Sequence, residues 1–143
     1  MAQNLNEVEN FFTMQNNVSK FQSVLRECGH GIKSLYGSHT KAGHLFEFTT
    51  PSGPAVLYVK ESNSQKGFWG LAKNQLEEFD KQTKWFVIFL LRSHDSGFVL
   101  PGNDILSNIK NDIFRLYYPD QYKVHENDLE GRSKFFSVTE LIN

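Results

Sequence analysis

The sequence is poor in the features that mark secreted, zinc-stabilised or membrane-spanning proteins. Its one cysteine, Cys28, cannot form an internal disulfide, and no CxxC or Cys/His ligand spacing is present. We expect this thiol to be buried rather than nucleophilic. The longest apolar stretch, Trp85–Leu91, is far shorter than the roughly 20 residues of a membrane helix. The first ten residues do not resemble a secretory signal, so we expect a soluble, cytoplasmic protein.

A strong charge of one sign is also missing. The formal net charge is -1, whereas nucleic-acid-binding proteins usually carry a basic surplus. Any basic surface must therefore be local. What the chain does have is ring area, because 14% of its 143 residues are aromatic and thirteen are Phe. That is enough to close one core, and residues 1–143 are predicted to form a single domain.

The first half of the chain is predicted to be a helix followed by three strands. Apolar residues recur at three- and four-residue steps over residues 8–28, which is the helical period. This stretch predicts one long helix, or two that are broken near residues 15–17. Short apolar segments at 32–36, 44–50 and 55–60 predict strands, and the Pro- and Gly-containing turn after residue 50 predicts that the last two pair as a hairpin.

The second half of the chain supplies two more helices and two more strands. Residues 67–70 are predicted to lead into an amphipathic helix that ends at residue 79, and a further helix is expected at 105–110. Trp85–Leu91 is an uninterrupted apolar run, typical of a central strand that is covered on both faces. Residues 98–100 should pair beside it. The fold class is thus α/β, with a mixed central β-sheet flanked by helices.

Glu47 and Lys60 form the most informative pair of polar residues. They lie on the two strands of the predicted hairpin, where alternation can bring both side chains to one face of the sheet. A carboxylate that holds a divalent cation, beside a lysine that steadies an attacking water, is a combination suited to phosphodiester hydrolysis. A solvated cross-strand salt bridge is the alternative interpretation of the same two residues.

The order of these elements resembles the PD-(D/E)xK nuclease-like superfamily, in particular the Holliday junction resolvases and the restriction endonuclease-like fold. The resemblance covers about residues 18–100. It implies that Glu47 stands in place of the family's aspartate, that Lys60 is its lysine and that Gln75 is its helix glutamine. It also implies an Mg²⁺- or Mn²⁺-dependent endonuclease that acts on DNA and forms a homodimer to cut two strands.

Tyr58 departs from that family pattern. It occupies the position of the Glu in the family's Glu-x-Lys, so one carboxylate and one negative charge are missing from the expected metal site. Either Glu61, or an N-terminal acid such as Glu7 or Glu9, takes over this role beside Glu47, or the site is a remnant. In the second case the chain is a catalytically inactive nuclease-fold domain that binds nucleic acid or a protein partner.

Several further residues could contact a nucleic acid near the same site. The stretch of residues 60–70 leads toward a predicted helix N-terminus, which favours phosphate. The expected nucleic-acid-binding residues are Ser38, Lys41, Lys66, Trp69 and Lys73. The competing interpretations are a plain connecting turn for the first two and a core ring for Trp69.

Overall fold

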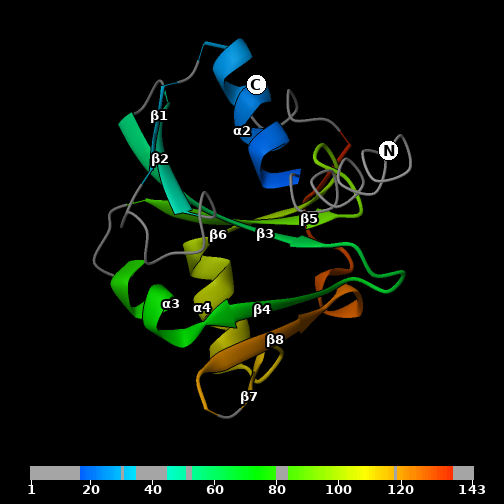
Figure 1. Cartoon of the computed structure of the whole chain (residues 1–143). Coiled ribbons are helices and arrows are strands. Elements are labelled where there is room, and N and C mark those ends of the chain that lie inside the picture. Colours follow the sequence, from blue (N-terminus) through cyan, green and yellow to red (C-terminus); the bar gives the residue numbers. More distant parts are fainter. Residues whose placement is uncertain are drawn as a thin grey trace, which may run out of the picture.

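The computed structural model describes residues 17–29, 31–34, 45–50, 53–79, 84–117 and 119–136, and these residues form an α/β structure with two sheets (Figure 1). The central sheet contains, in spatial order, β1 (Ile32–Ser34), β2 (Leu45–Thr50), β3 (Gly53–Ser62), β5 (Trp85–Leu91), β6 (Gly97–Pro101) and β9 (Lys134–Phe135). β3 and β5 pair in parallel, and the other neighbours pair antiparallel. The predicted mixed central sheet is confirmed.

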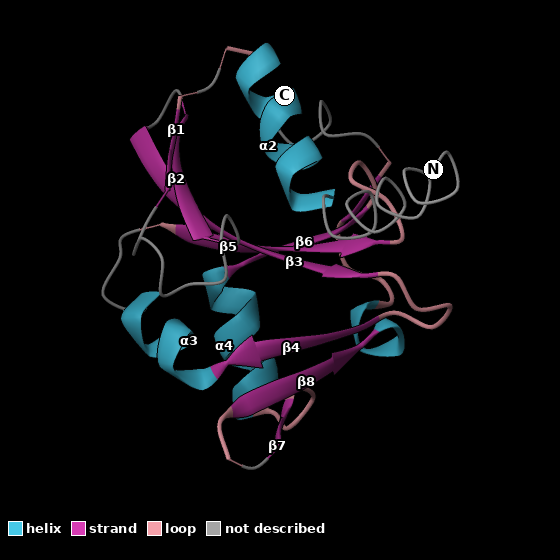
Figure 2. Cartoon of the chain, viewed as in Figure 1, coloured by secondary structure: helices cyan, strands magenta, loops and turns pink. Residues whose placement is uncertain are grey.

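Helices lie on both faces of this sheet (Figure 2). Helix α2 (Asn17–Glu27) covers one face, while α3 (Lys73–Phe79) and α4 (Gly102–Lys110) lie on the other. The smaller sheet lies on the α3 and α4 side, in the order β4-β8-β7. Its strands, and the 3-10 helix that follows them, are β4 (Phe68–Ala72), β7 (Arg115–Tyr117), β8 (Gln121–His125) and η2 (Glu126–Leu129).

The core has two halves, one on each face of the central sheet. Along β5, Val87 and Phe89 enter the half that faces β4 and α4, while Ile88 and Leu90 enter the half that faces α2. This alternation follows from the two-residue period of a strand. The uninterrupted apolar run was thus correctly read as a central strand covered on both sides, and β2 and β3 form the expected hairpin.

The residues before α3 differ from the prediction. Phe68–Ala72 was expected to lead into a helix, yet it is strand β4, and the helix begins only at Lys73. The reason is long-range: β4 pairs along its whole length with β8, some fifty residues later in the chain. Period-two burial, with Trp69 and Leu71 inside, is the local sign of this pairing.

At the end of α2, the predicted glycine stop is present, but the predicted burial of Cys28 is wrong. Gly29 ends α2 with a φ of 90° and donates its N–H to the Arg26 carbonyl at 2.9 Å, as a glycine stop should. Cys28 was expected to be buried and is exposed, because it follows the last helical residue. Residues 8–16 of the predicted helix lie outside the described residues.

Within the described part of the chain, no helix has the length and apolar character needed to cross a membrane.

Candidate functional site

Glu47 and Lys60 share a face of the central sheet without being neighbours on it. Glu47 pairs directly with Val56, and Lys60 lies four residues further along β3, so both side chains fall on the same side. Four residues of strand span about 13 Å, whereas directly opposed residues are about 5 Å apart. Glu47 and Lys60 thus share a face, as predicted, but the pairing of β2 with β3 does not place them side by side.

Glu61 lies on the opposite face. It pairs in regular register with Leu90, whose side chain faces α2, and no bulge turns it back. Burial raises the pKa of the Glu61 carboxyl, and hydrogen bonds from Asn17 at the start of α2 partly offset this. Its Oε2 atom is buried and has no hydrogen-bond partner among the described residues. Glu47 and Glu61 therefore cannot hold the same cation in this structure.

Tyr58, at the position where the family has an acid, is a core residue. Its side chain is only 5% exposed, and its hydroxyl accepts a hydrogen bond from the Ala72 N–H at 3.4 Å. Burial raises the pKa of this hydroxyl. The Lys60 ammonium lies 5.4 Å from the centre of the Tyr58 ring. Tyr58 thus joins β3 to the end of β4, and its neutral phenol cannot replace a carboxylate ligand.

Gln75 and Lys73 both lie on α3, below the Glu47 face of the sheet (Figure 1). The Oε1 atom of Gln75 is buried and lacks a hydrogen-bond partner among the described residues, while the next residue, Leu76, packs into the core. Lys73 is half-buried, and its N–H donates to the Asp120 carbonyl at 2.8 Å. Gln75 is thus on the expected side of the sheet.

Trp69 is a core residue in this structure and has no ring face available to a base. It is 2% exposed, its Nε1–H donates to the Leu90 carbonyl at 3.1 Å, and its ring packs edge-on against Phe89 at 5.3 Å. The structure therefore agrees with the alternative interpretation, in which Trp69 is a core ring. Lys66 remains exposed just before β4, and Ser38 and Lys41 lie outside the described residues.

A magnesium centre needs several oxygen ligands around one point. Among the described residues, no group of three or more His, Cys, Asp or Glu side chains is placed to hold a metal ion. With Tyr58 in the core and Glu61 on the far face, Glu47 is the acid of the expected site that remains among the described residues, and Glu7 and Glu9 lie outside them. The described residues do not fit the Mg²⁺ or Mn²⁺ site that the family resemblance implies.

A different cluster of side chains lies on the outer face of the β4-β8-β7 sheet. Alternation buries Trp69, Leu71 and Val124 and turns their neighbours outward. The register then aligns Phe68 with His125, and Arg115 with Lys123. We call this surface the cationic-aromatic face; it consists of Phe68, Arg115, Tyr117, Lys123 and His125.

Lys123 lies between two exposed rings on this face. Its Nζ atom is 4.6 Å from the centre of the Phe68 ring and 5.0 Å from the centre of the Tyr117 ring. Phe68 is 39% exposed and Tyr117 is 66% exposed. His125 packs against Phe68 in an edge-on arrangement, with ring centres 5.1 Å apart. One ammonium group is thus flanked by two rings that water reaches.

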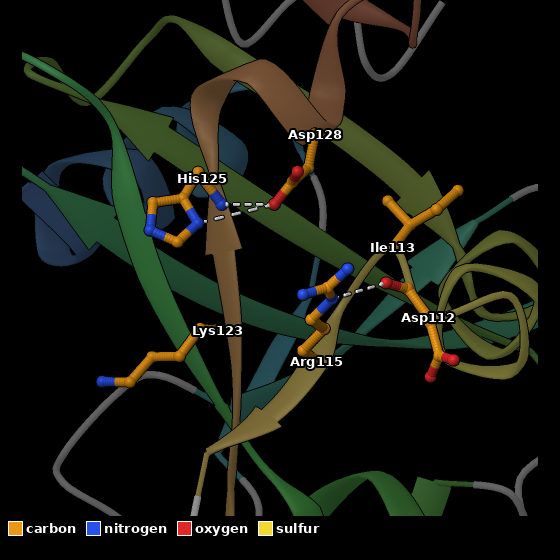
Figure 3. A pocket seen from close by; sticks show the side chains of 6 residues that line it. All are labelled: Asp112, Ile113, Arg115, Lys123, His125 and Asp128. Atoms are coloured by element: carbon orange, nitrogen blue, oxygen red, sulfur yellow. Dashed lines mark hydrogen bonds and ion pairs between the residues drawn. The ribbon is translucent and has the colours of Figure 1, made fainter.

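Two adjoining shallow hollows, of about 420 and 430 Å³, mark the same face, and Arg115, Lys123 and His125 line both. Figure 3 shows the first hollow, with the Lys123 side chain extending away from Asp112 and Asp128. The Arg115 Nε–H donates to the Asp112 carbonyl at 3.3 Å. Asp128 accepts the His125 backbone N–H at 2.8 Å, so it is the N3 residue of a capping box in which His125 is the N-cap of η2. Asp128 Oδ2 also lies 3.7 Å from His125 Nδ1, so this hollow is lined by acids as well as by the exposed Arg115 and the half-buried Lys123.

No motif in the sequence predicted this face. Its residues come from three strands that are separated by many positions in the chain, and none of them shows a recognisable spacing motif. The available signals were local and weak. Gln121–His125 alternates polar and apolar side chains as a half-exposed strand does, and Tyr117 precedes a Pro-containing turn.

Comparisons with known proteins identify no relative. No protein-family model, no curated protein and no solved structure matches this chain. The likeness to the nuclease-like superfamily therefore depends on the order of elements and on Glu47, Lys60 and Gln75.

Proposed function

We propose that this chain is a nucleic-acid-binding domain and that the cationic-aromatic face is its binding surface. The observation that carries the proposal is the position of the Lys123 ammonium between the Phe68 and Tyr117 rings, with Arg115 directly opposite on the next strand. A nucleic acid offers anionic phosphates next to flat bases, and this face offers cations next to flat rings.

The energies favour an exchange of partners at Lys123. An exposed cation–π contact is worth about 0.5–1 kcal/mol. A base stacked on an aromatic side chain is worth about 1–3 kcal/mol, and the released ammonium can then neutralise a phosphate. The contacts seen on this face are thus weaker than those that a bound strand would supply in their place.

The near-neutral chain is compatible with this proposal because the cations are gathered locally. Arg115 and Lys123 are the two basic residues of the face apart from His125, and the exposed Lys66 lies two residues before Phe68. The nearby Glu126 lies 3.9 Å from the Arg92 guanidinium, and it accepts the Gly67 N–H at 3.0 Å. That carboxylate thus contacts Gly67 and Arg92, which are not residues of the cationic-aromatic face.

The proposal is tested by measuring binding of a labelled oligonucleotide over a range of salt concentrations. Lys123→Gln removes one phosphate contact, so its affinity should fall and the slope of log K against log salt should drop by about 0.7–1. Lys20→Gln is the control, because it removes one exposed lysine charge from α2 on the far side of the central sheet. Equal losses in both variants would assign the binding to bulk charge and refute the proposal.

A second candidate function is the DNA endonuclease expected from the sequence. It retains one supporting observation: Glu47 and Lys60 share a sheet face, and Gln75 with its buried Oε1 atom lies on the same side. The cation ligands besides Glu47 would have to come from outside the described residues. Plasmid nicking in Mg²⁺ or Mn²⁺ that Lys60→Ala abolishes would support this candidate, whereas absence of nicking, or nicking that the variant keeps, would refute it.

A further inference from the structure

The outer face of the small sheet carries small side chains along part of its edge strand β4. Gly70 lies directly opposite Lys123 in the β4–β8 register, and Ala72 lies opposite Gln121. A Cβ atom at Gly70 would come within 2.7 Å of the Gln121 Oε1 atom, so the amide already rests over this bare backbone. The small side chains of Gly70 and Ala72 on β4 add little bulk between Phe68 and Tyr117, and the long side chains there are those of the central strand β8.

This geometry distinguishes between forms of nucleic acid. In a duplex the bases are stacked on each other, and only their edges are reached through the grooves. A helix or a two-stranded ribbon enters a major groove, but the rings on this face lie on the outer surface of a three-stranded sheet. The bases of a single strand are free to unstack and to lie on exposed rings.

Resting on the proposed function, we infer that the cationic-aromatic face binds single-stranded nucleic acid, with bases stacked on Phe68 and Tyr117 and the phosphates between them held by Lys123 and Arg115. The flanking of one ammonium by two rings matches the repeating unit of such a strand, in which each phosphate has a base on either side. Stacking on rings does not distinguish the bases, so the preference for sequence should be weak.

An acidic protein segment is the competing occupant. It would use Arg115 and Lys123 and would gain little from the two rings, because carboxylates do not stack. The contribution of the two rings to the binding affinity therefore distinguishes a single-stranded nucleic acid from an acidic protein segment.

The test uses the full chain and fluorescently labelled probes of about 20 nucleotides, longer than the roughly 4–16 nucleotides that a small domain covers. The probes are a single strand, the duplex of the same sequence and an abasic single strand that keeps the phosphates without bases. We expect the single strand to bind more tightly than the other two, by about tenfold or more.

Four variants assign that preference to the rings. Tyr117→Leu and Phe68→Leu should each weaken single-strand binding by about 5- to 100-fold and leave abasic binding nearly unchanged. Tyr117→Phe keeps the ring and should bind as the unaltered chain does. The matched control is Phe136→Leu, because Phe136 is also 66% exposed and lies under a lysine, Lys134, at 5.3 Å, but at the far edge of the central sheet.

The outcomes are distinguishable. If no probe binds, the proposed function itself fails. If all probes bind equally and the leucine variants have no effect, the single-strand inference is overturned while phosphate binding stands. If polyglutamate displaces the single strand as efficiently as the abasic probe does, the face is a general anion site and the inference is likewise overturned. Circular dichroism of each variant confirms that a loss of binding is not a loss of fold.

Discussion

Glu47 and Glu61 lie on opposite faces of the six-stranded sheet. Glu47 is directly opposed to Val56 on the β4 side, whereas Glu61 pairs with Leu90 and contacts Asn17 on the α2 side. Because β3 pairs without interruption from Val56 to Ser62, alternation alone enforces this separation. The expected pair of metal ligands is thus divided by the sheet itself.

The first prediction concerns Mg²⁺ and Mn²⁺. A cation bound only by the native state at 100 times its dissociation constant would stabilise the fold by about 2.7 kcal/mol. We expect millimolar Mg²⁺ or Mn²⁺ to leave the midpoint of thermal unfolding unchanged, and Glu47→Gln to behave as the unaltered chain does. A rise of several degrees that Glu47→Gln abolishes would show instead that Glu47 belongs to a cation site.

The second prediction concerns the pH dependence of stability at Glu61. Burial raises the folded-state pKa of this carboxyl above its unfolded value, so the protonated form favours folding. This contribution is fully present below the unfolded pKa, which is near 4.5, and is lost as the pH rises through the raised folded-state pKa. Glu61→Gln, which stays neutral, should therefore melt at a higher temperature than the unaltered chain at pH 7.

The difference should shrink toward pH 4, where Glu61 is protonated in both states. Thermal unfolding followed by circular dichroism at a series of pH values measures it. Glu77→Gln is the control, because Glu77 is exposed on α3 and its loss should shift stability little at any pH. Parallel pH profiles for Glu61→Gln and the unaltered chain would contradict the assignment.

The third prediction concerns Trp69. Trp69→Phe removes the hydrogen bond to the Leu90 carbonyl and part of a buried ring, so it should lower the free energy of unfolding by about 1–3 kcal/mol in denaturant titrations. At temperatures where the variant is folded, its affinity for a nucleic acid should be unchanged. A selective loss of binding without a loss of stability would return Trp69 to the role of a base-stacking residue.

The fourth prediction concerns the glycine that opens β6. A Cβ atom at Gly97 would lie 1.8 Å from the backbone oxygen of Phe89, and backbone cannot move aside as a flexible side chain can. Gly97→Ala should therefore destabilise the fold by about 2–3 kcal/mol or more. Gly131→Ala, where nothing lies within 4 Å, should cost only the strain of its positive φ, about 1 kcal/mol. Equal costs in urea titrations would contradict this contrast.

The sequence by itself determined the elements whose signals are local. The apolar run Trp85–Leu91, the hairpin of β2 and β3 and the glycine after α2 each follow from the residues in and beside the element. Alternation along β3 likewise places Glu61 and Lys60 on opposite faces of the sheet. These features need no knowledge of distant partners, because period, turn chemistry and side-chain direction are properties of short segments.

Only the tertiary structure decided which face of the molecule carries the chemistry proposed here. Phe68 belongs to a strand because β4 pairs with β8. This pairing places Lys123 beside Phe68 and beside Tyr117 of β7. Strand pairing between distant segments depends on the burial of Trp69, Leu71 and Val124 together, which no single segment encodes. The cationic-aromatic face is the outward side of that pairing, so it exists only once the inward side has packed.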